Sequence, residues 1–461
     1  MNSQSKKMEL LGSTSIPKAL LAMGIPTMIG MLVNAFYNLV DAYFVGGLGE
    51  SQMGAISVVY PLGQVVVGLG LLFGNGAASY ISRLLGRGDK ENADKVASTA
   101  LYSSVSVGAV IIIISMVFLH PILKLLGATD SILPFAAAYA SLYIVSCIFN
   151  VFNVTMNNIV TSEGAAKTTM CALLTGAVLN IALDPLFIYV FDLGVAGAAI
   201  ATAISQVVST CVYLTYILRK KSVFHFRVKD CTYTKENMSE IFKIGIPTLV
   251  FQILTSVSIS LINNAAGDYG DSAIAGMGVV TRLISMGSLS VFGFIKGFQP
   301  IAGYSYGAKK FDRLREAIKT SILWSTVFCV IFGMILALFP TAIVSRFTKG
   351  DTEMIRIGAA SLRANGISIM LFGFYTVYSS LFLALGKGRE GFILGACRQG
   401  ICFIPVILLL PIVWGLNGIL YAQPIADVLS AVITVFMAIP LHKKLNEMQK
   451  QTSAISTKDN D

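Results

Sequence analysis

Charged residues are scarce in this sequence. Only 13% of the 461 residues are Asp, Glu, Lys or Arg, whereas a soluble protein would carry roughly a quarter. The few charges gather in short segments between apolar stretches of about 20 residues, the length that a helix needs to cross a bilayer. This scarcity excludes an ordinary soluble protein and indicates an all-α membrane protein with several spans.

Other patterns are missing as well. Short segments of alternating polar and apolar residues are absent, which argues against a transmembrane β-barrel. The N-terminus is polar and the first apolar run is long enough to span, so we expect no cleaved signal peptide. The seven cysteines include no CxxC, and the three histidines are scattered. We therefore expect neither a disulfide framework nor a metal site.

Motifs of catalysis and of ATP use are also absent. No GxxxxGK[ST] loop occurs, since Gly386-Lys387 is followed by Gly388, which excludes ATP hydrolysis by that route. We find no nucleophile–base constellation and no channel selectivity filter, so we expect no enzyme, no catalytic residues and no bound cofactor. The net charge of +10 is typical of basic loops and predicts no nucleic-acid partner. An ion gradient is the simplest remaining energy source.

We expect twelve transmembrane spans. They are assigned to residues 20–43, 53–81, 96–118, 131–158, 169–190, 195–218, 241–264, 273–303, 320–340, 355–383, 391–411 and 416–440. Several exceed the roughly 20 residues that a bilayer requires, so we expect those helices to tilt, bend or project from the membrane.

Basic residues fall mainly on one side of these spans. Of the 34 Lys and Arg residues, 26 lie on the side that holds both termini, and the opposite loops hold only Lys124, Arg346, Lys349 and Arg356. Because cytoplasmic loops of membrane proteins are enriched in Lys and Arg, we expect both termini in the cytoplasm.

The two halves of the sequence repeat at an offset of 221 residues, since IPT occurs at 25–27 and again at 246–248. The same offset aligns Gly76 with Gly297 and Gly86 with Gly307. Each half holds six spans, so an axis along the membrane normal should relate them. We divide the chain into an N-terminal six-helix lobe, a cytoplasmic linker, a C-terminal six-helix lobe and a cytoplasmic tail, at 1–218, 219–240, 241–440 and 441–461. The substrate is expected between these two pseudo-symmetric lobes.

Four segments, in this order, carry a family resemblance. They are IPTMIGMLVNAFYNLVDAYFVGGLG, FGNGAASYISRLLGRGDKENA, LNIALDPLFIYVFDLGVAGAAIATAISQ and QPIAGYSYGAKKFDRLREA. They resemble transporters of the MATE (multidrug and toxic compound extrusion) family, in particular the bacterial branch of MepA- and DinF-like proteins, and the resemblance covers essentially the whole chain. It implies the MATE fold and cation-coupled export of organic, often cationic, compounds by alternating access of two six-helix lobes.

Polar residues inside the N-terminal spans share one depth. At a rise of about 1.5 Å per residue, Asp41, Asp184, Tyr139 and Thr202 all fall in the outer half of spans 1, 5, 4 and 6. Asn180 precedes Asp184 by four residues and so faces the same way. Such a group is either a site for a cation or a static hydrogen-bonded cluster that fixes helix packing.

The resemblance implies a role for this group, because the aspartates of spans 1 and 5 couple transport to a cation in the MATE family. Asp41 and Asp184 are the matching residues, with Asn180, Tyr139 and Thr202 as their shell. A carboxylate in a poorly hydrated cavity is costly to ionise, so it can hold a proton in one access state and lose it in the other. The same oxygens could instead coordinate Na⁺. We favour H⁺, because the C-terminal half shows no obvious cation site.

The residues expected to line the substrate cavity come from both halves, namely Asn34, Tyr37, Asn38, Arg282, Lys296 and Arg398. Some family members carry an acidic residue at the position of Lys296, which is thought to serve cationic drugs, so a lysine there argues against cationic substrates. Alternatively, Lys296 extends to the membrane interface, and Arg398 or Arg363 pairs with Asp427.

Two prolines are candidate hinges. Pro185 leaves the carbonyl of Ile181 without its usual donor, which would bend span 5 beside Asp184. Pro26 could bend span 1 in the same way, although proline is cheap near a helix start. We expect a change in the occupancy of Asp41 or Asp184 to alter the packing of span 1 and shift the inward–outward equilibrium.

Together these features predict an antiporter in a bacterial inner membrane. We expect a monomer in contact with lipid that exports small organic compounds or drugs and is driven by entry of H⁺ or Na⁺. The alternative is a flippase for a lipid-linked or anionic oligosaccharide, which the cations of the C-terminal half favour. Twelve spans and the Asp41–Asp184 pair argue against it.

Overall fold

The computed structural model describes residues 3–48, 50–126, 128–347 and 351–458, and its elements are all helical in these ranges. The N-terminal half contains α1 (Ser3–Gly12), α2 (Ile16–Gly46), α3 (Glu50–Gly86), α4 (Lys90–Val117), α5 (Leu119–Leu125), α6 (Leu133–Ser162), α7 (Ala166–Pro185), the π-helical turn η1 (Leu186–Val190) and α8 (Gly194–Leu218).

The C-terminal half follows a short 3₁₀ turn, η2 (Val228–Asp230), in the linker. It contains α9 (Lys235–Gly267), α10 (Asp271–Gly307), α11 (Phe311–Leu338), α12 (Pro340–Val344), η3 (Ser345–Phe347), α13 (Thr352–Ser368), η4 (Ile369–Leu371), α14 (Phe372–Ala384), α15 (Gly388–Ala396), the π-helical turn η5 (Cys397–Ile401), α16 (Phe403–Trp414) and α17 (Leu416–Lys458).

Twelve helical segments of the described residues are long and apolar enough to cross a membrane, which confirms the predicted number of spans. Helices suit this setting because they satisfy their backbone hydrogen bonds internally. Side-chain caps start several of them. For example, Asp351 accepts from the backbone N–H groups of Glu353 and Met354, each at 3.0 Å, at the start of α13.

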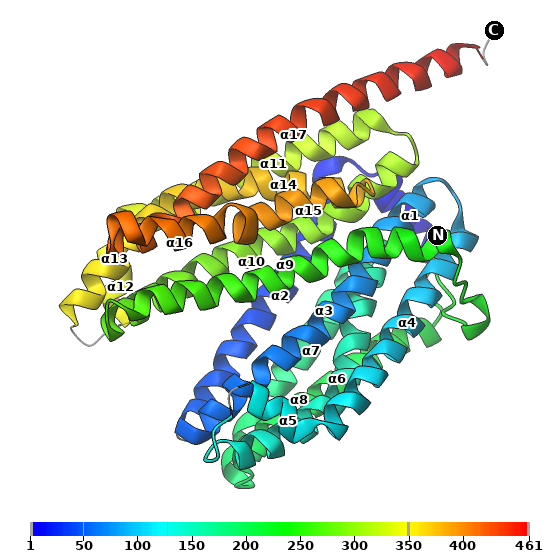
Figure 1. Ribbon diagram of the computed structural model, residues 1–461. Helices are drawn as coiled ribbons and strands as arrows, with labels where there is room; N and C mark the ends of the chain where they lie inside the picture. The colour runs from blue at the N-terminus through cyan, green and yellow to red at the C-terminus, as the bar shows by residue number, and fades with distance from the viewer. Residues whose placement is uncertain (1–2, 49, 127, 348–350, 459–461) are drawn as a thin grey trace.

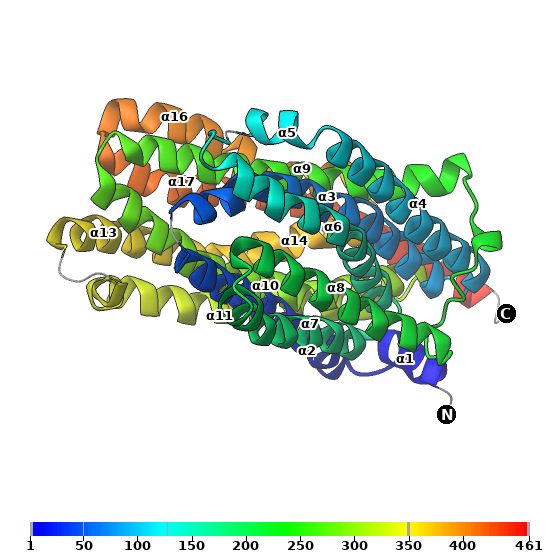
Figure 2. The same ribbon diagram turned by 90° about the horizontal axis from the view of Figure 1, so that it is seen from below.

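The helices form two lobes that diverge like the arms of a V (Figure 1). The N-lobe contains α2 to α8 and the C-lobe contains α9 to α17. Both ends of the chain and the linker at 219–234 lie at one side of the molecule, which we call the terminal face (Figures 1 and 2). The opposite ends of the helices, at Gly46, Leu125 and Trp414, form the far face, where the lobes are apart.

The contacts between the lobes follow the sequence repeat. Helix α2, the first span, packs against α10, the eighth span, and α9, the seventh, packs against α3, the second. The sequence repeat relates the first span to the seventh and the second span to the eighth, so the two contacts are equivalent. Packing of this kind is expected from a two-fold axis along the membrane normal.

Aligned glycines make these contacts between lobes. A Cβ added at Gly76 would lie 2.3 Å from the carbonyl oxygen of Ile241, and one at its repeat partner Gly297 would lie 2.4 Å from the backbone nitrogen of Gly24. Gly86 and Gly307 are reciprocal: their added Cβ atoms would lie 2.2 Å from the oxygen of Tyr304 and 2.1 Å from that of Arg83. The terminal face is therefore closed by backbones in direct contact, which only glycine permits.

Helix α1, which was not predicted, straps the two lobes together at the terminal face. On the N-lobe, Lys7 donates to the buried carboxylate of Glu163 at 3.1 Å, which also accepts from the Tyr216 hydroxyl and the Ser222 hydroxyl. On the C-lobe, the Arg313 guanidinium donates to backbone carbonyls at the end of α1 and just beyond it. A buried charge needs such a partner, and these contacts attach α1 to both lobes.

Two predicted boundaries differ from the observed helices. Helix α9 begins at Lys235, within the segment assigned as the linker, and α17 continues to Lys458, through most of the segment assigned as the tail. The polar continuation of α17 packs by Leu441 and Leu445 into the C-lobe core. Hydropathy marks where a helix leaves the membrane, not where it ends.

Candidate functional site

Six polar side chains near the far face of the N-lobe form what we call the carboxylate cluster. Helix α2 contributes Tyr37 and Asp41, α7 contributes Asn180 and Asp184, and α6 and α8 contribute Tyr139 and Thr202. Asp184, Asn180 and Tyr139 are almost completely buried. The spacing of four residues between members on the same helix places them on one face.

Asn180 and the two aspartates lie close together. The Asn180 amide donates to Asp184 Oδ1 at 3.3 Å and to Thr202 Oγ1 at 3.4 Å. The carboxyl groups of Asp41 and Asp184 are close enough to interact with each other. Two ionised carboxylates at short range repel, so the pair is favourable only when a proton or a cation lies between them.

The two tyrosines enclose this pair. Tyr37 and Tyr139 lie close enough to Asp41 to interact with its charge, and the Tyr139 ring stacks on Tyr143 with centroids 5.4 Å apart. The five residues predicted for coupling thus lie together. Tyr37, which was predicted for the substrate cavity, lies with them instead.

Several oxygen atoms of the cluster lack a hydrogen-bond donor. Among the described residues, Asp41 Oδ1, Asn180 Oδ1 and Asp184 Oδ2 are buried without a partner, and neither aspartate belongs to a salt bridge. Buried polar atoms are normally satisfied. A cluster of acceptors without donors is suited to a bound proton or a small cation.

The backbone is irregular directly beside Asp184. Helix α7 ends at Pro185 and continues as the π-helical turn η1, in which the Phe191 N–H donates to the Leu186 oxygen at 2.9 Å. The ring of Pro185 removes one α-helical hydrogen bond, so the helix widens there. Sequence analysis anticipated an irregular helix at this point. Whether Pro185 moves remains a prediction.

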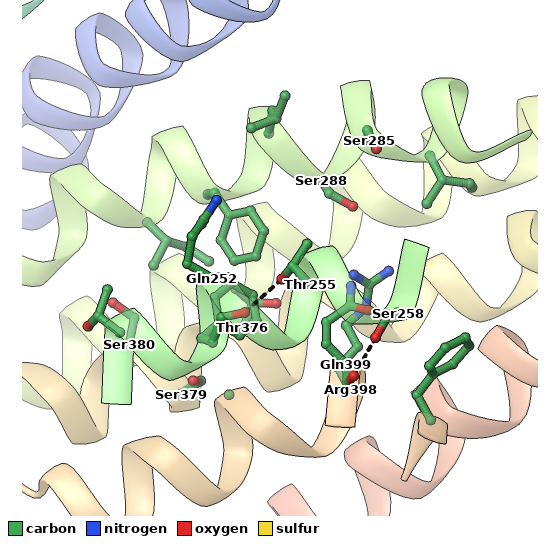
Figure 3. A pocket seen from close by; sticks show the side chains of 18 of the residues that line it. Gln252, Thr255, Ser258, Ser285, Ser288, Thr376, Ser379, Ser380, Arg398 and Gln399 are labelled. Atoms are coloured by element: carbon green, nitrogen blue, oxygen red, sulfur yellow. Dashed lines mark hydrogen bonds between the residues drawn. The ribbon is translucent and has the colours of Figure 1, made fainter. Parts of the chain in front are cut away.

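A cavity of about 510 Å³ lies mainly inside the C-lobe. Its walls come from α9, α10, α14, α15 and η5, and α2, α3 and α6 contribute a few residues at the boundary between the lobes. Figure 3 shows hydroxyl and amide groups facing it, among them Gln252, Thr255, Ser288 and Thr376. Its size lies within the range of small-molecule sites.

Two cations line this cavity, and their partners differ. The Lys296 ammonium group donates to the side-chain oxygen of Asn157, across the boundary between the lobes. Arg398, on the π-helical turn η5, donates from Nε to Asp427 Oδ1 at 3.0 Å, and Asp427 also accepts from Ser368 at 2.9 Å. Arg398 is therefore charge-compensated, while Lys296 faces a neutral amide.

Other predicted substrate residues lie elsewhere. Arg282 is exposed and does not line the cavity, and Arg363, the other candidate partner of Asp427, is exposed on α13. Asn34 and Asn38 pair with each other, the Asn38 amide donating to Asn34 Oδ1 at 3.0 Å, and neither lines the C-lobe cavity.

Sequence reasoning missed part of both sites. Tyr37 precedes Asp41 by four residues, and this spacing alone could have assigned it to the carboxylate cluster. Gln299, which lines the C-lobe cavity, follows Lys296 by three residues on α10 and could have been found in the same way. Asn157 left no such signal, because only the packing of α6 against α10 brings it to Lys296. In the described residues, no group of His, Cys, Asp or Glu is arranged to hold a metal ion, and the seven cysteines are free.

Comparison with known families gives a match in each lobe. The MatE family model matches residues 26–186 and 247–409. The two matches start 221 residues apart, which is the offset of the internal repeat.

Comparison with characterised proteins and solved structures extends over nearly the whole chain. The chain is 32% identical to the multidrug export protein MepA of Staphylococcus aureus over 429 residues, 93% of this chain and 94% of that protein. It is 32% identical to the MepA protein of Staphylococcus saprophyticus, over 94% of this chain and 95% of that one. A multidrug resistance MATE family transporter solved in an outward-facing conformation superposes with a TM-score of 0.90 at 26% identity, over 96% of this chain and 99% of the other.

Proposed function

The chain belongs to the MATE family of membrane transporters, and from this premise we propose that it exports small organic compounds, including drugs, in exchange for a cation. It is a transporter and not an enzyme. The observation that carries the proposal is that Asp41 and Asp184, two carboxylates of the N-lobe, interact with each other and have buried oxygens without a partner and no salt bridge among the described residues. Two such groups need a proton or a metal cation between them.

We propose H⁺ as the coupling ion in preference to Na⁺. One proton shared by Asp41 and Asp184 would satisfy both carboxyl groups, with Asn180, Thr202 and Tyr139 as the shell. Proton release would leave two negative charges in contact, which favours a rearrangement of α2 against α7. Among the described residues that line the C-lobe cavity none is Asp or Glu, which argues against a second cation site there.

The course of α2 supports a hinge at Pro26. Met23, Gly24, Thr27 and Met28, on both sides of this residue, pack against Gly297 and Gly293 of α10, in the C-lobe, and Gly30 packs against Leu173 of α7, in the N-lobe. Pro26 thus lies about one turn before the helix passes from one lobe to the other. A change at Asp41 would move the N-lobe part of α2 and, through this point, the contact between lobes.

The shape supports alternating access. The lobes are in contact at the terminal face and apart at the far face (Figure 1). If both termini are cytoplasmic, as the basic loops predict, this is the outward-facing state, which agrees with the conformation named for the similar solved structure. We propose that the protein works as a monomer in a bacterial inner membrane.

The size of the cavity favours a small substrate over the flippase alternative. A volume of about 510 Å³ suits a drug-sized molecule, whereas a lipid-linked oligosaccharide is several times larger. The cations of the C-lobe bear on the charge of the substrate and do not require a lipid carrier.

Transport by purified protein in proteoliposomes tests the proposal. An imposed pH gradient should drive export of compounds from a mixed-charge panel, and Asp41→Asn or Asp184→Asn should abolish this dependence while the variants still fold. A Na⁺ gradient alone should have little effect. Normal gradient-driven transport by both variants would refute the coupling role, and a response to Na⁺ alone would assign the ion differently.

A further inference from the structure

We propose that the C-lobe cavity selects organic compounds that carry an acidic group on an apolar body, with Lys296 as the residue that binds the acid. The inference rests on the proposed export function, because it names the substrate class of that transporter. It is argued from the charges, donors and walls of the cavity.

The charge of the cavity has one sign. Among the described residues that line it, Lys296 and Arg398 are charged and none is Asp or Glu. Asp427 compensates Arg398 from behind the wall at 3.0 Å, which leaves Lys296 as the uncompensated charge. An organic cation would meet a like charge there without any carboxylate to bind it, which is unfavourable in a poorly hydrated site.

Lys296 offers more than its charge. An ammonium group has three donors, and the bond to Asn157 uses one of them. Gln299, three residues along α10, lines the cavity and has a side-chain nitrogen without a hydrogen-bond partner among the described residues. A donor beside a cation is what a carboxylate, sulfonate or phosphate requires.

The rest of the cavity is apolar. Phe251, Phe292, Ile259 and Met277 contribute to its walls, and the Phe251 and Phe292 rings pack edge to face at 6.2 Å. Such walls suit an aromatic or aliphatic body, whereas a small hydrophilic anion would gain nothing from them. The fitting ligand is therefore an acidic amphiphile.

The acidic and basic sites are separated between the lobes. None of the six residues of the carboxylate cluster lines the C-lobe cavity. A bound acid would therefore not compete with the coupling cation for Asp41 and Asp184. This separation lets one lobe exchange the cation while the other holds an anionic substrate.

Equilibrium binding to the purified full chain in nanodiscs of zwitterionic phospholipid tests the inference. Three fluorescent probes share one aromatic body: N-dansylglycine is acidic, its methyl ester is neutral, and dansylcadaverine carries an amine. We expect N-dansylglycine to bind most tightly. Lys296→Gln should weaken its binding about tenfold or more, the usual effect of losing a charge-assisted hydrogen bond, with little effect on the ester.

Further variants make the test specific. Lys296→Arg should keep the preference for the acid, and Lys296→Glu should shift it towards dansylcadaverine. Lys319→Gln, which removes an exposed charge on α11 of the same lobe, should leave all three affinities unchanged. If Lys296→Gln fails to fold, the ranking of the probes on the unmodified protein and on Lys296→Arg decides the matter.

The inference fails if dansylcadaverine binds the unmodified protein at least as tightly as N-dansylglycine, or if Lys296→Gln binds all probes normally. Its failure is distinct from that of the proposed function, because binding needs no gradient. Export of dansylcadaverine that depends on Asp184 would uphold antiport and overturn the acid preference. A clear acid preference without gradient-driven export would uphold the acid preference and overturn antiport.

Discussion

Asp184 and Asp427 are both buried carboxylates inside membrane spans, with 0% and 1% of their surface exposed. Asp427 has Arg398, Ser368 and Gln423 as donors. Asp184 has one amide and a second carboxyl group. At the scale of the residue, the partner decides the role. Asp427 belongs to a satisfied ion pair, whereas Asp184 is left with oxygens that need a proton or a cation.

The ion pair can be tested by stability. Arg398→Met leaves Asp427 as a buried charge without its cation, which typically costs about 3–5 kcal/mol, and thermal unfolding in detergent should show a large loss. The double change Arg398→Met with Asp427→Leu should recover much of it, because no unpaired charge remains.

Arg356→Met is the matched control. Arg356 pairs with Glu353 at the surface, with 65% and 53% of the two side chains exposed, and such pairs contribute less than about 1 kcal/mol. An equal loss of stability in the Arg356 and Arg398 variants would show that burial does not determine the strength of the Arg398–Asp427 pair.

Helices meet across the lobes at the glycines of the repeat. Helix α10 approaches α3 so closely at Gly307 that an added Cβ would lie 2.1 Å from the oxygen of Arg83. Backbone atoms cannot move aside as the end of a side chain can. At the scale of the element, closure of the terminal face therefore depends on glycines, whose lack of a side chain lets the two helix backbones meet.

Gly307→Ala should open the terminal face. The added methyl group clashes with α3 in the observed state but has room once the lobes separate there, so the equilibrium should shift towards separation. Spin labels on α4 and α11 at the terminal face should report longer distances than in the unmodified protein.

The same helix supplies a control for this prediction. A Cβ added at Gly278 meets nothing within 4 Å, so Gly278→Ala should leave the distances unchanged. Unchanged distances in the Gly307 variant would show that the lobes adjust without separating. Closure of the terminal face would then not require a glycine at this position.

Both lobes also place a π-helical turn next to a buried charged residue. In the N-lobe, η1 follows Asp184 and Pro185, and in the C-lobe η5 contains Arg398. A π-helical turn widens the helix and frees backbone groups locally. Each lobe thus has a local irregularity of the helix at or directly beside a buried charged residue.

The whole molecule is a V whose closed end carries both termini (Figure 1). Its orientation in the membrane is a proposal that rests on the loops, since the basic segments lie at the terminal face and the far face carries few cations. If the basic loops are cytoplasmic, the far face opens to the outside.

Labelling of single cysteines in intact cells tests this orientation. In a background without Cys171, Cys211 and Cys231, we expect Leu125→Cys, at the far face and 87% exposed, to react with a membrane-impermeant maleimide. Lys444→Cys, exposed on α17 at the terminal face, should react only after the cells are permeabilised. The reverse pattern would place the termini outside and make the observed state inward-facing.

Periodicity and hydropathy by themselves determined the twelve spans, the two six-helix halves and their offset, because a bilayer requires apolar segments of fixed length and a duplicated lobe keeps its glycines. Helical spacing also put Asn180 beside Asp184. The closeness of Asp41 to Asp184 rested on an estimate of depth, since these residues lie on separate helices.

Tertiary structure alone decided which polar residues meet across helices. The sequence placed Lys296, Arg398 and Arg282 in spans of the C-terminal half and gave no reason to assign them different surroundings. Packing paired Arg398 with Asp427, turned Arg282 to the surface and brought Lys296 to the wall of the C-lobe cavity. The rotation of each helix about its axis and the crossing of α6 with α10 determine such contacts. Both depend on the fit of many apolar side chains and leave no local pattern in the sequence.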